Sequence, residues 1–223
     1  MCEHQITQAK QNFLNKYNPD QTIHTALSKS LGAAARRNDL YCLVSAPSQS
    51  TLRIEIQTIW KHYLTLIAAY FITLRQNNAA EPFNWAIPDP QPQPNFNGGF
   101  PNDHQFHPPT DQQIANYRAL ITGLKDAMNK QFARGFRPTG FRISHSQKSI
   151  SVFLKHLWCM QHVPMPIECP IDFNILKTLP NNGRTVSWTK IDDIESHARM
   201  ITALNNLAQP MPLARWELLH FNF

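Results

Sequence analysis

A lysine and an aspartate in the second half of the chain stand where side chains gain reactivity. Lys148 falls in the first turn of a helix that we predict to start near residues 144–146, beside unpaired backbone N–H groups and the positive end of the helix dipole. Together with Arg142 and His145, this positive charge disfavours the ammonium form, which makes an amine nucleophilic. Asp172 falls in the first turn of the next predicted helix. The carboxylate reaches the amine only if the connection folds back over the first helix.

Each of these residues also has an ordinary structural interpretation. Asp172 comes two positions after Pro170, a natural first helical residue, and could simply cap the free N–H groups there. Lys148 could be a surface lysine or a plain phosphate contact. His145 is the best-placed acid–base residue, because it precedes Lys148 in the same loop.

Positive charge is concentrated in the same part of the chain. The net charge is +6, and residues 118–190 hold eleven Lys and Arg against three acids, with no acid between Asp126 and Glu168. Such a block indicates binding to a phosphate backbone, and the alternative is a solvated basic face without a partner. We therefore predict DNA binding through residues 130–155, with contacts from Arg134, Arg137, Arg142, Ser144, His145, Ser146 and Lys155.

The order of these features resembles the helix-hairpin-helix DNA glycosylase superfamily over about residues 138–177. A basic loop is followed by Lys148 at a helix start, an apolar helix, and then a Pro-Ile-Asp sequence that ends at Asp172. The resemblance implies that Lys148 attacks C1′ of a nucleoside whose base is flipped out of the duplex, and that Asp172 stabilises the sugar cation. Ser144 and Ser146 stand where that superfamily has its hairpin glycines.

Helices must position these residues, because the chain has only 7 Gly but 17 Pro and shows helical spacing of apolar side chains along most of its length. We predict an all-α fold, an irregular helical bundle of about 7–9 helices with a long Pro/Asn-rich loop. Capping boxes are predicted at Thr110–Gln113 and Ser144–Gln147, and another helix start at Thr189–Asp192.

The chain divides into an N-terminal helical part, residues 1–75, a Pro/Asn/Gln-rich loop, residues 76–110, and a C-terminal helical part with the basic region, residues 111–223. We expect the parts to form one compact unit. The aromatic residues of the loop would either lie on the helical body or stack on a ligand; they are Phe83, Trp85, Phe96, Phe100 and Phe106.

Several classes of protein lose support. The N-terminus lacks the apolar segment of a secretory signal, and the apolar run of residues 64–74 is too short for a membrane span, so we expect a cytoplasmic protein without membrane contact. The four cysteines would then be reduced thiols. We expect neither a metal site nor a cofactor, since the common nucleotide-binding, zinc-protease and serine-hydrolase motifs are missing from the sequence.

Two functions stay open. The first is a DNA-binding protein with a glycosylase-like core that cleaves an N-glycosidic bond of a damaged or modified nucleotide, with Lys148 and Asp172 as the catalytic pair. The second is a non-catalytic helical accessory protein that binds nucleic acid or a protein partner. Both require the same basic loop, so the sequence does not separate them.

Overall fold

The helices and their order come from a computed structural model, which describes residues 3–35, 40–41, 47–76, 82–85, 96, 100, 107–180 and 187–220, without the side chains of residues 47–50. These residues form eight α-helices and a 3-10 helix, η2, and no β-strand. The helices are α1 (Glu3–Tyr17), α2 (Ile23–Ala35), α3 (Pro47–Gln76), α4 (Asp111–Phe132), α5 (Ile143–Cys159), α6 (Phe173–Leu176), η2 (Trp188–Lys190), α7 (Ile194–Ala208) and α8 (Leu213–His220). The predicted all-α fold is confirmed.

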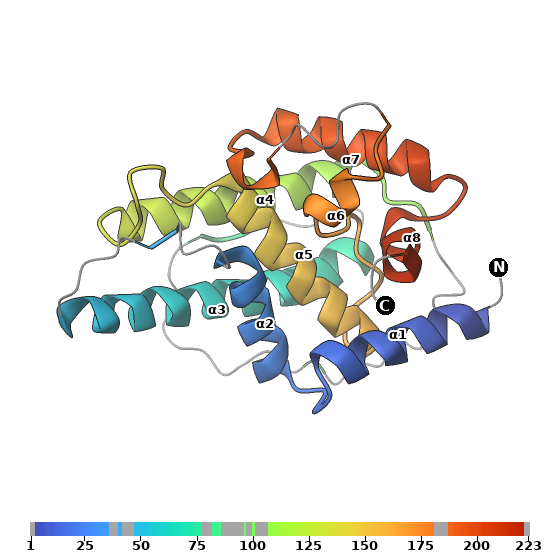
Figure 1. Cartoon of the computed structure of the whole chain (residues 1–223), viewed down its shortest axis with the longest axis horizontal. Helices are drawn as coiled ribbons and strands as arrows, with labels where there is room; N and C mark the ends of the chain where they lie inside the picture. Colours follow the sequence, from blue (N-terminus) through green and yellow to red (C-terminus); the bar gives the residue numbers. More distant parts are fainter. Residues whose placement is uncertain are drawn as a thin grey trace.

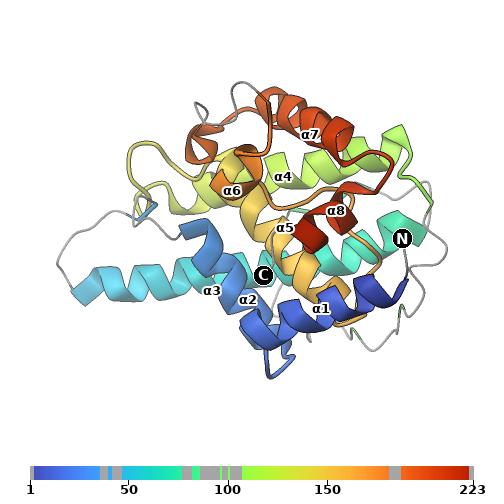
Figure 2. The ribbon, with the colours of Figure 1, turned by 45° about the vertical axis from the view of Figure 1, so that its right-hand side comes forward.

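Helix α5 runs obliquely through the middle of the molecule, with α4 and α7 on one side and α1 on the other (Figures 1 and 2). It packs against α1, α2, α3 and α4, and every one of its residues except Val152 is buried. Its apolar residues enter a core cluster that includes residues of every helix from α1 to α8. Burial on all sides means that the polar residues of α5 need partners within the protein.

Those partners come from several different elements. The Ser146 hydroxyl donates to the carbonyl oxygen of Ile121 in α4 at 2.5 Å. Trp60 of α3 donates its indole N–H to the Ser149 hydroxyl at 3.1 Å. Lys155 Nζ lies 2.8 Å from Glu217 Oε1 of α8, and both side chains are buried. The polar residues of α5 therefore fix which helices surround it.

Helix starts show where local sequence decides the structure. The predicted capping box at Thr110 is confirmed, because its hydroxyl accepts from the Gln113 N–H and the Gln113 side chain accepts from the Thr110 N–H. The prediction at Ser144 is wrong. Helix α5 begins at Ile143, and the backbone N–H of Ser144 donates to the carbonyl of Ile191, far along the chain.

The helix start predicted at Thr189 is also displaced. Thr189 lies in η2, and α7 begins at Ile194, where the Asp193 side chain accepts the Ser196 N–H at 2.6 Å. Asp193 therefore caps α7, in place of the predicted Thr189. The chain between η2 and α7 stays free to bond to the start of α5 instead.

Part of the Pro/Asn-rich loop lies against the helical body. The rings of Phe83 and Tyr70 meet edge to face at 5.5 Å, and Trp85 packs on Tyr63 at 5.8 Å. Phe96 is buried as well. Phe83, Trp85 and Phe96 thus serve packing, whereas Phe106 lies outside the described residues. Among the described helices, none has the length and apolar character that crossing a bilayer requires.

Candidate active site

Lys148 and Asp172 meet. Lys148 Nζ lies 3.0 Å from Asp172 Oδ2, and the two side chains are 9% and 37% exposed. Lys148 is the sixth residue of α5 and so lies in the second turn, one turn deeper than predicted. A nearly buried amine is therefore held against a carboxylate that solvent still reaches.

The contact requires the chain to return along α5, which spans about 16 Å between Lys148 and its last residue at ~1.5 Å per residue. The reversal begins directly after the helix. Gln161 adopts a positive φ of 64°, and the N–H of His162 donates to the Leu157 carbonyl at 2.8 Å. The twelve residues that follow Cys159 then lead back to Asp172. The fold-back that the sequence left conditional is thus present.

Gln147 fixes the returning segment in register. Its amide donates to the Ile171 carbonyl at 3.2 Å and accepts from the Ile171 N–H at 3.3 Å. Gln147 and Ile171 are both fully buried. Asp172 follows Ile171, so these two bonds determine the position along α5 at which the Asp172 carboxylate lies beside Lys148. The capping interpretation of Gln147 concealed this role, and no local sequence signal would have revealed it.

The two carboxylate oxygens of Asp172 have different hydrogen-bond partners. Oδ1 accepts the N–H groups of Asn174 and Ile175 at 2.9 and 3.0 Å, and Oδ2 accepts the Lys148 ammonium. Asp172 is therefore the residue that caps α6, which begins at Phe173 and not at Pro170 as predicted. The carboxylate is oriented from both sides.

The pKa of Asp172 is lower than that of an ordinary aspartate. Burial makes the largest contribution and raises the pKa, but it is outweighed by the charge of Lys148 and by the hydrogen bonds from Ile175, Lys148 and Asn174. Asp172 therefore stays ionised at neutral pH. It can face a developing positive charge without first losing a proton.

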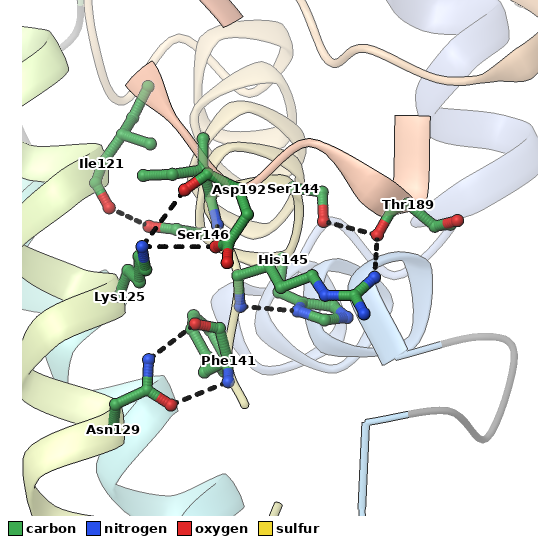
Figure 3. A network of polar contacts seen from close by, with 11 residues as sticks. Ile121, Lys125, Asn129, Phe141, Ser144, His145, Ser146, Thr189 and Asp192 are labelled. Carbon is green, nitrogen blue, oxygen red and sulfur yellow. Dashed lines mark hydrogen bonds and ion pairs between the residues drawn. The ribbon is translucent and has the colours of Figure 1, made fainter. Parts of the chain in front are cut away.

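The start of α5 is joined directly to η2 by hydrogen bonds (Figure 3). Arg142 donates from Nη1 to the Thr189 carbonyl at 2.7 Å, and the Ser144 hydroxyl donates to the same oxygen at 3.2 Å. These bonds hold η2 so that the Trp188 ring lies 5.8 Å from Lys148 Nζ. Trp188 is half-buried and Phe173, next to Asp172, is 44% exposed.

The residues predicted to contact DNA fall into two groups. Ser144, His145, Ser146 and Lys155 are buried in α5 and bonded inside the protein. His145 Nδ1, for instance, accepts the Arg142 N–H at 2.9 Å (Figure 3). A phosphate contact by these side chains would require internal bonds to open. They position helices in the structure as it stands.

The second group lies in the loop between α4 and α5. Arg134 is exposed, while Arg137 and Arg142 are half-buried. Gly140, with φ 65°, makes the turn of this loop, and the Asn129 amide holds it by bonding to both the N–H and the carbonyl of Phe141 (Figure 3). The loop is thus anchored on α4, next to the start of α5.

No metal centre is formed by the described residues, since no three His, Cys, Asp or Glu side chains among them are grouped closely enough to hold an ion. Cys159 and Cys169 are free thiols and both are buried. Burial, the largest cause, raises the pKa of Cys169 well above its ordinary value, so this thiol is protonated. The candidate reactive groups are therefore the amine of Lys148 and the carboxylate of Asp172.

No family, no curated protein and no solved structure matches this chain. The function of the Lys148–Asp172 site is accordingly argued from its geometry.

Proposed function

We propose that the protein binds DNA and uses Lys148 and Asp172 to cleave an N-glycosidic bond of a damaged or modified nucleotide. The observation that carries the proposal is the 3.0 Å contact between Lys148 Nζ and Asp172 Oδ2, in which the amine is nearly buried and the carboxylate half-exposed. A lysine amine and an oriented carboxylate in contact are the two groups that this reaction needs.

The chemistry assigns one task to each group. Once Lys148 has released its proton to water, Nζ attacks C1′ of the nucleotide, the C1′–N bond breaks, and its electron pair leaves with the base, which takes up a proton from water. The ionised Asp172 faces the positive charge that develops on the sugar and stabilises it. Asp172 is already oriented by α6 and by Lys148, so this stabilisation requires little reorganisation.

Exposed cations around the site support a polyanionic substrate. Lys177 follows Asp172 at the end of α6, Lys190 follows Trp188 in η2, and both are exposed. Phe173 presents an exposed ring beside the pair, with Lys177 Nζ 4.2 Å from its centroid. Cations interleaved with exposed aromatic rings are typical of surfaces that bind unpaired nucleotides.

The same contacts also favour the second function, a non-catalytic helical protein that binds nucleic acid or a protein partner. Both oxygens of Asp172 are engaged, one by the α6 backbone and one by Lys148. An ion pair that ties α6 to α5 would have this geometry without any reaction. A chemical test is therefore needed to choose between the two.

The test is borohydride trapping on a duplex that contains one abasic site, because the reagent reduces an imine between an amine and C1′ to a stable bond. We expect a covalent adduct with the wild-type protein and its loss in Lys148→Ala. Asp172→Asn should trap roughly tenfold less or lower still, since the protonated imine that forms between the amine and C1′ loses its countercharge. Lys16→Ala is the matched control, because it removes an exposed amine of α1 outside the proposed binding surface, and it should keep the adduct.

Two results would reject parts of the proposal. A wild-type protein that binds DNA but gives no adduct would reject the enzyme in favour of the non-catalytic binder. A protein without any salt-dependent DNA affinity would reject DNA as the partner altogether. Circular dichroism of each variant shows whether a lost adduct reflects lost chemistry or a lost fold.

A further inference from the structure

A groove of about 320 Å³ lies between α2 and α3. These helices lie side by side in Figures 1 and 2, away from α7. Small residues of α2 form one wall, polar residues of α3 form the other, and Tyr41 completes the lining. The residues are Ser28, Leu31, Gly32, Ala35, Tyr41, Arg53, Gln57 and Lys61, and we call this hollow the α2–α3 groove.

The polar wall of the α2–α3 groove is cationic. Arg53, Gln57 and Lys61 follow one another at intervals of four residues and so share one face of α3. None of the described lining residues is an acid. Among the described residues, neither Arg53 nor Lys61 forms an ion pair with a carboxylate. Within the described part of the chain, two positive charges therefore line the hollow without a paired carboxylate.

Tyr41 supplies a hydrogen-bonding group at the same place. The side chain is 7% exposed, and its hydroxyl makes no hydrogen bond of good geometry within the described part of the chain. Burial, the largest cause, raises its pKa, and the nearby Gln57 amide and Arg53 charge lower it in part. The Arg53 guanidinium lies 4.9 Å from the centre of the Tyr41 ring. The hydroxyl therefore remains a donor next to a cation.

The opposite wall leaves room for a ligand. A Cβ atom added at Gly32 would have no atom within 4 Å, so the space over α2 is open at this residue. Glycine in a helix interior costs up to about 1 kcal/mol relative to alanine. Alanine would fit here, which gives a clean way to separate helix stability from ligand binding.

We propose that the α2–α3 groove binds a phosphomonoester dianion. Arginine, lysine and a tyrosine hydroxyl are donors suited to phosphate oxygens, and two cations match the two charges of a phosphomonoester better than the single charge of a carboxylate. The hollow is at the small end of ligand sites, which suits a phosphate with one modest organic group. The phosphate comes either from a small molecule or from the 5′ end of a nucleic acid strand. None of the lining residues belongs to the Lys148–Asp172 site, so this inference does not depend on the proposed function.

Calorimetric titration of the full chain tests the proposal with four probes. They are inorganic phosphate, a nucleoside 5′-monophosphate, and one short single strand with either a 5′-phosphate or a 5′-hydroxyl. We expect the monophosphate or the phosphorylated strand to bind, and Arg53→Gln and Lys61→Gln each to weaken that binding roughly tenfold or more. Gly32→Leu should block the groove, whereas Gly32→Ala should bind like the wild type and unfold at slightly higher temperature.

The matched control is Arg199→Gln, which removes one exposed positive charge on α7. It should leave the affinity for the monophosphate unchanged. Binding of the nucleoside monophosphate alone assigns a small molecule, and binding that requires the strand with a 5′-phosphate assigns a strand end. Equal losses in Arg199→Gln and Arg53→Gln, or no binding of any probe, would overturn the proposal.

Discussion

Gln147 and Ile171 exchange two hydrogen bonds, one in each direction, between the side-chain amide of α5 and the backbone of a segment that arrives from the far end of the helix. The arrangement mimics one step of a β-ladder, with a glutamine in place of a second strand. It satisfies a buried N–H and a buried carbonyl at once. Because Asp172 follows Ile171, the same two bonds determine where the carboxylate of the candidate site lies.

Substitution of Gln147 by leucine should therefore lower the free energy of unfolding. Gln147→Leu keeps a similar volume but leaves the N–H and carbonyl of Ile171 buried without partners, and we expect a loss of about 3 kcal/mol in the free energy of unfolding. Urea denaturation measures it. The exposed Gln112 of α4 is the control, and Gln112→Leu should change stability by less than about 0.5 kcal/mol. Equal effects of the two variants would show that the Ile171 contact contributes no stability.

Lys155 and Glu217 form a buried ion pair that joins α5 to α8. Glu217→Gln leaves the ammonium of Lys155 buried without its countercharge and should cost about 3–5 kcal/mol in unfolding free energy. The double variant Lys155→Met, Glu217→Leu removes both charges and should recover most of that loss. Denaturant unfolding of the two variants checks the order. A double variant less stable than Glu217→Gln would contradict this interpretation of the pair.

The apolar periodicity predicted where most helices lie, because that signal is local. Ile150, Phe153 and Leu154 of α5 are buried as their spacing indicated. The spacing did not reveal that the polar face of α5 is buried too. Lys155 pairs with a residue 62 positions away, and its basic charge indicated a surface. The tertiary fold determines which distant residues become partners, and local composition carries no information about that fold.

The candidate site was likewise only partly predictable from the sequence. Lys148 and Asp172 were singled out from their places near helix starts, and the structure brings them together. The helix start predicted at Ser144 failed because the Ile191 carbonyl, from a distant segment, satisfies the backbone N–H of Ser144. Thr110, by contrast, was predicted correctly, because its capping partner Gln113 is three residues away.

His156 should make the protein lose stability in mild acid. The ring is buried against Phe13, with a centroid distance of 4.7 Å. Burial first, and then the charges of Lys155 and Lys29, lower its pKa from 6.5 to about 3. Below pH 6.5, His156 therefore binds a proton in the unfolded chain but not in the folded protein. The free energy of unfolding falls as the pH drops from about 6.5 toward 3.

Between pH 7 and 5 this histidine alone should cost about 2 kcal/mol of unfolding free energy. Urea unfolding at a series of pH values measures the slope in the wild type and in His156→Leu. The difference between the two proteins isolates His156 from His162, whose pKa is also lowered by burial. Parallel slopes would show that His156 is protonated in the folded protein, contrary to its surroundings.

Because the Trp85 ring lies directly on Gly123 of α4, we expect the fold to require glycine at this position. A Cβ atom at Gly123 would overlap the Trp85 indole, so Gly123→Ala must push the ring off the helix. In a helix interior the same exchange otherwise stabilises by up to about 1 kcal/mol, because alanine orders more readily than glycine.

The two effects have opposite signs and can be separated by a double-mutant cycle. Gly123→Ala should destabilise the wild type, but should stabilise the Trp85→Ala variant, in which nothing stands in the way of the methyl group. Thermal unfolding of the four proteins gives both differences, and a stabilising Gly123→Ala in the wild type would mean that Trp85 does not rest on α4 in solution.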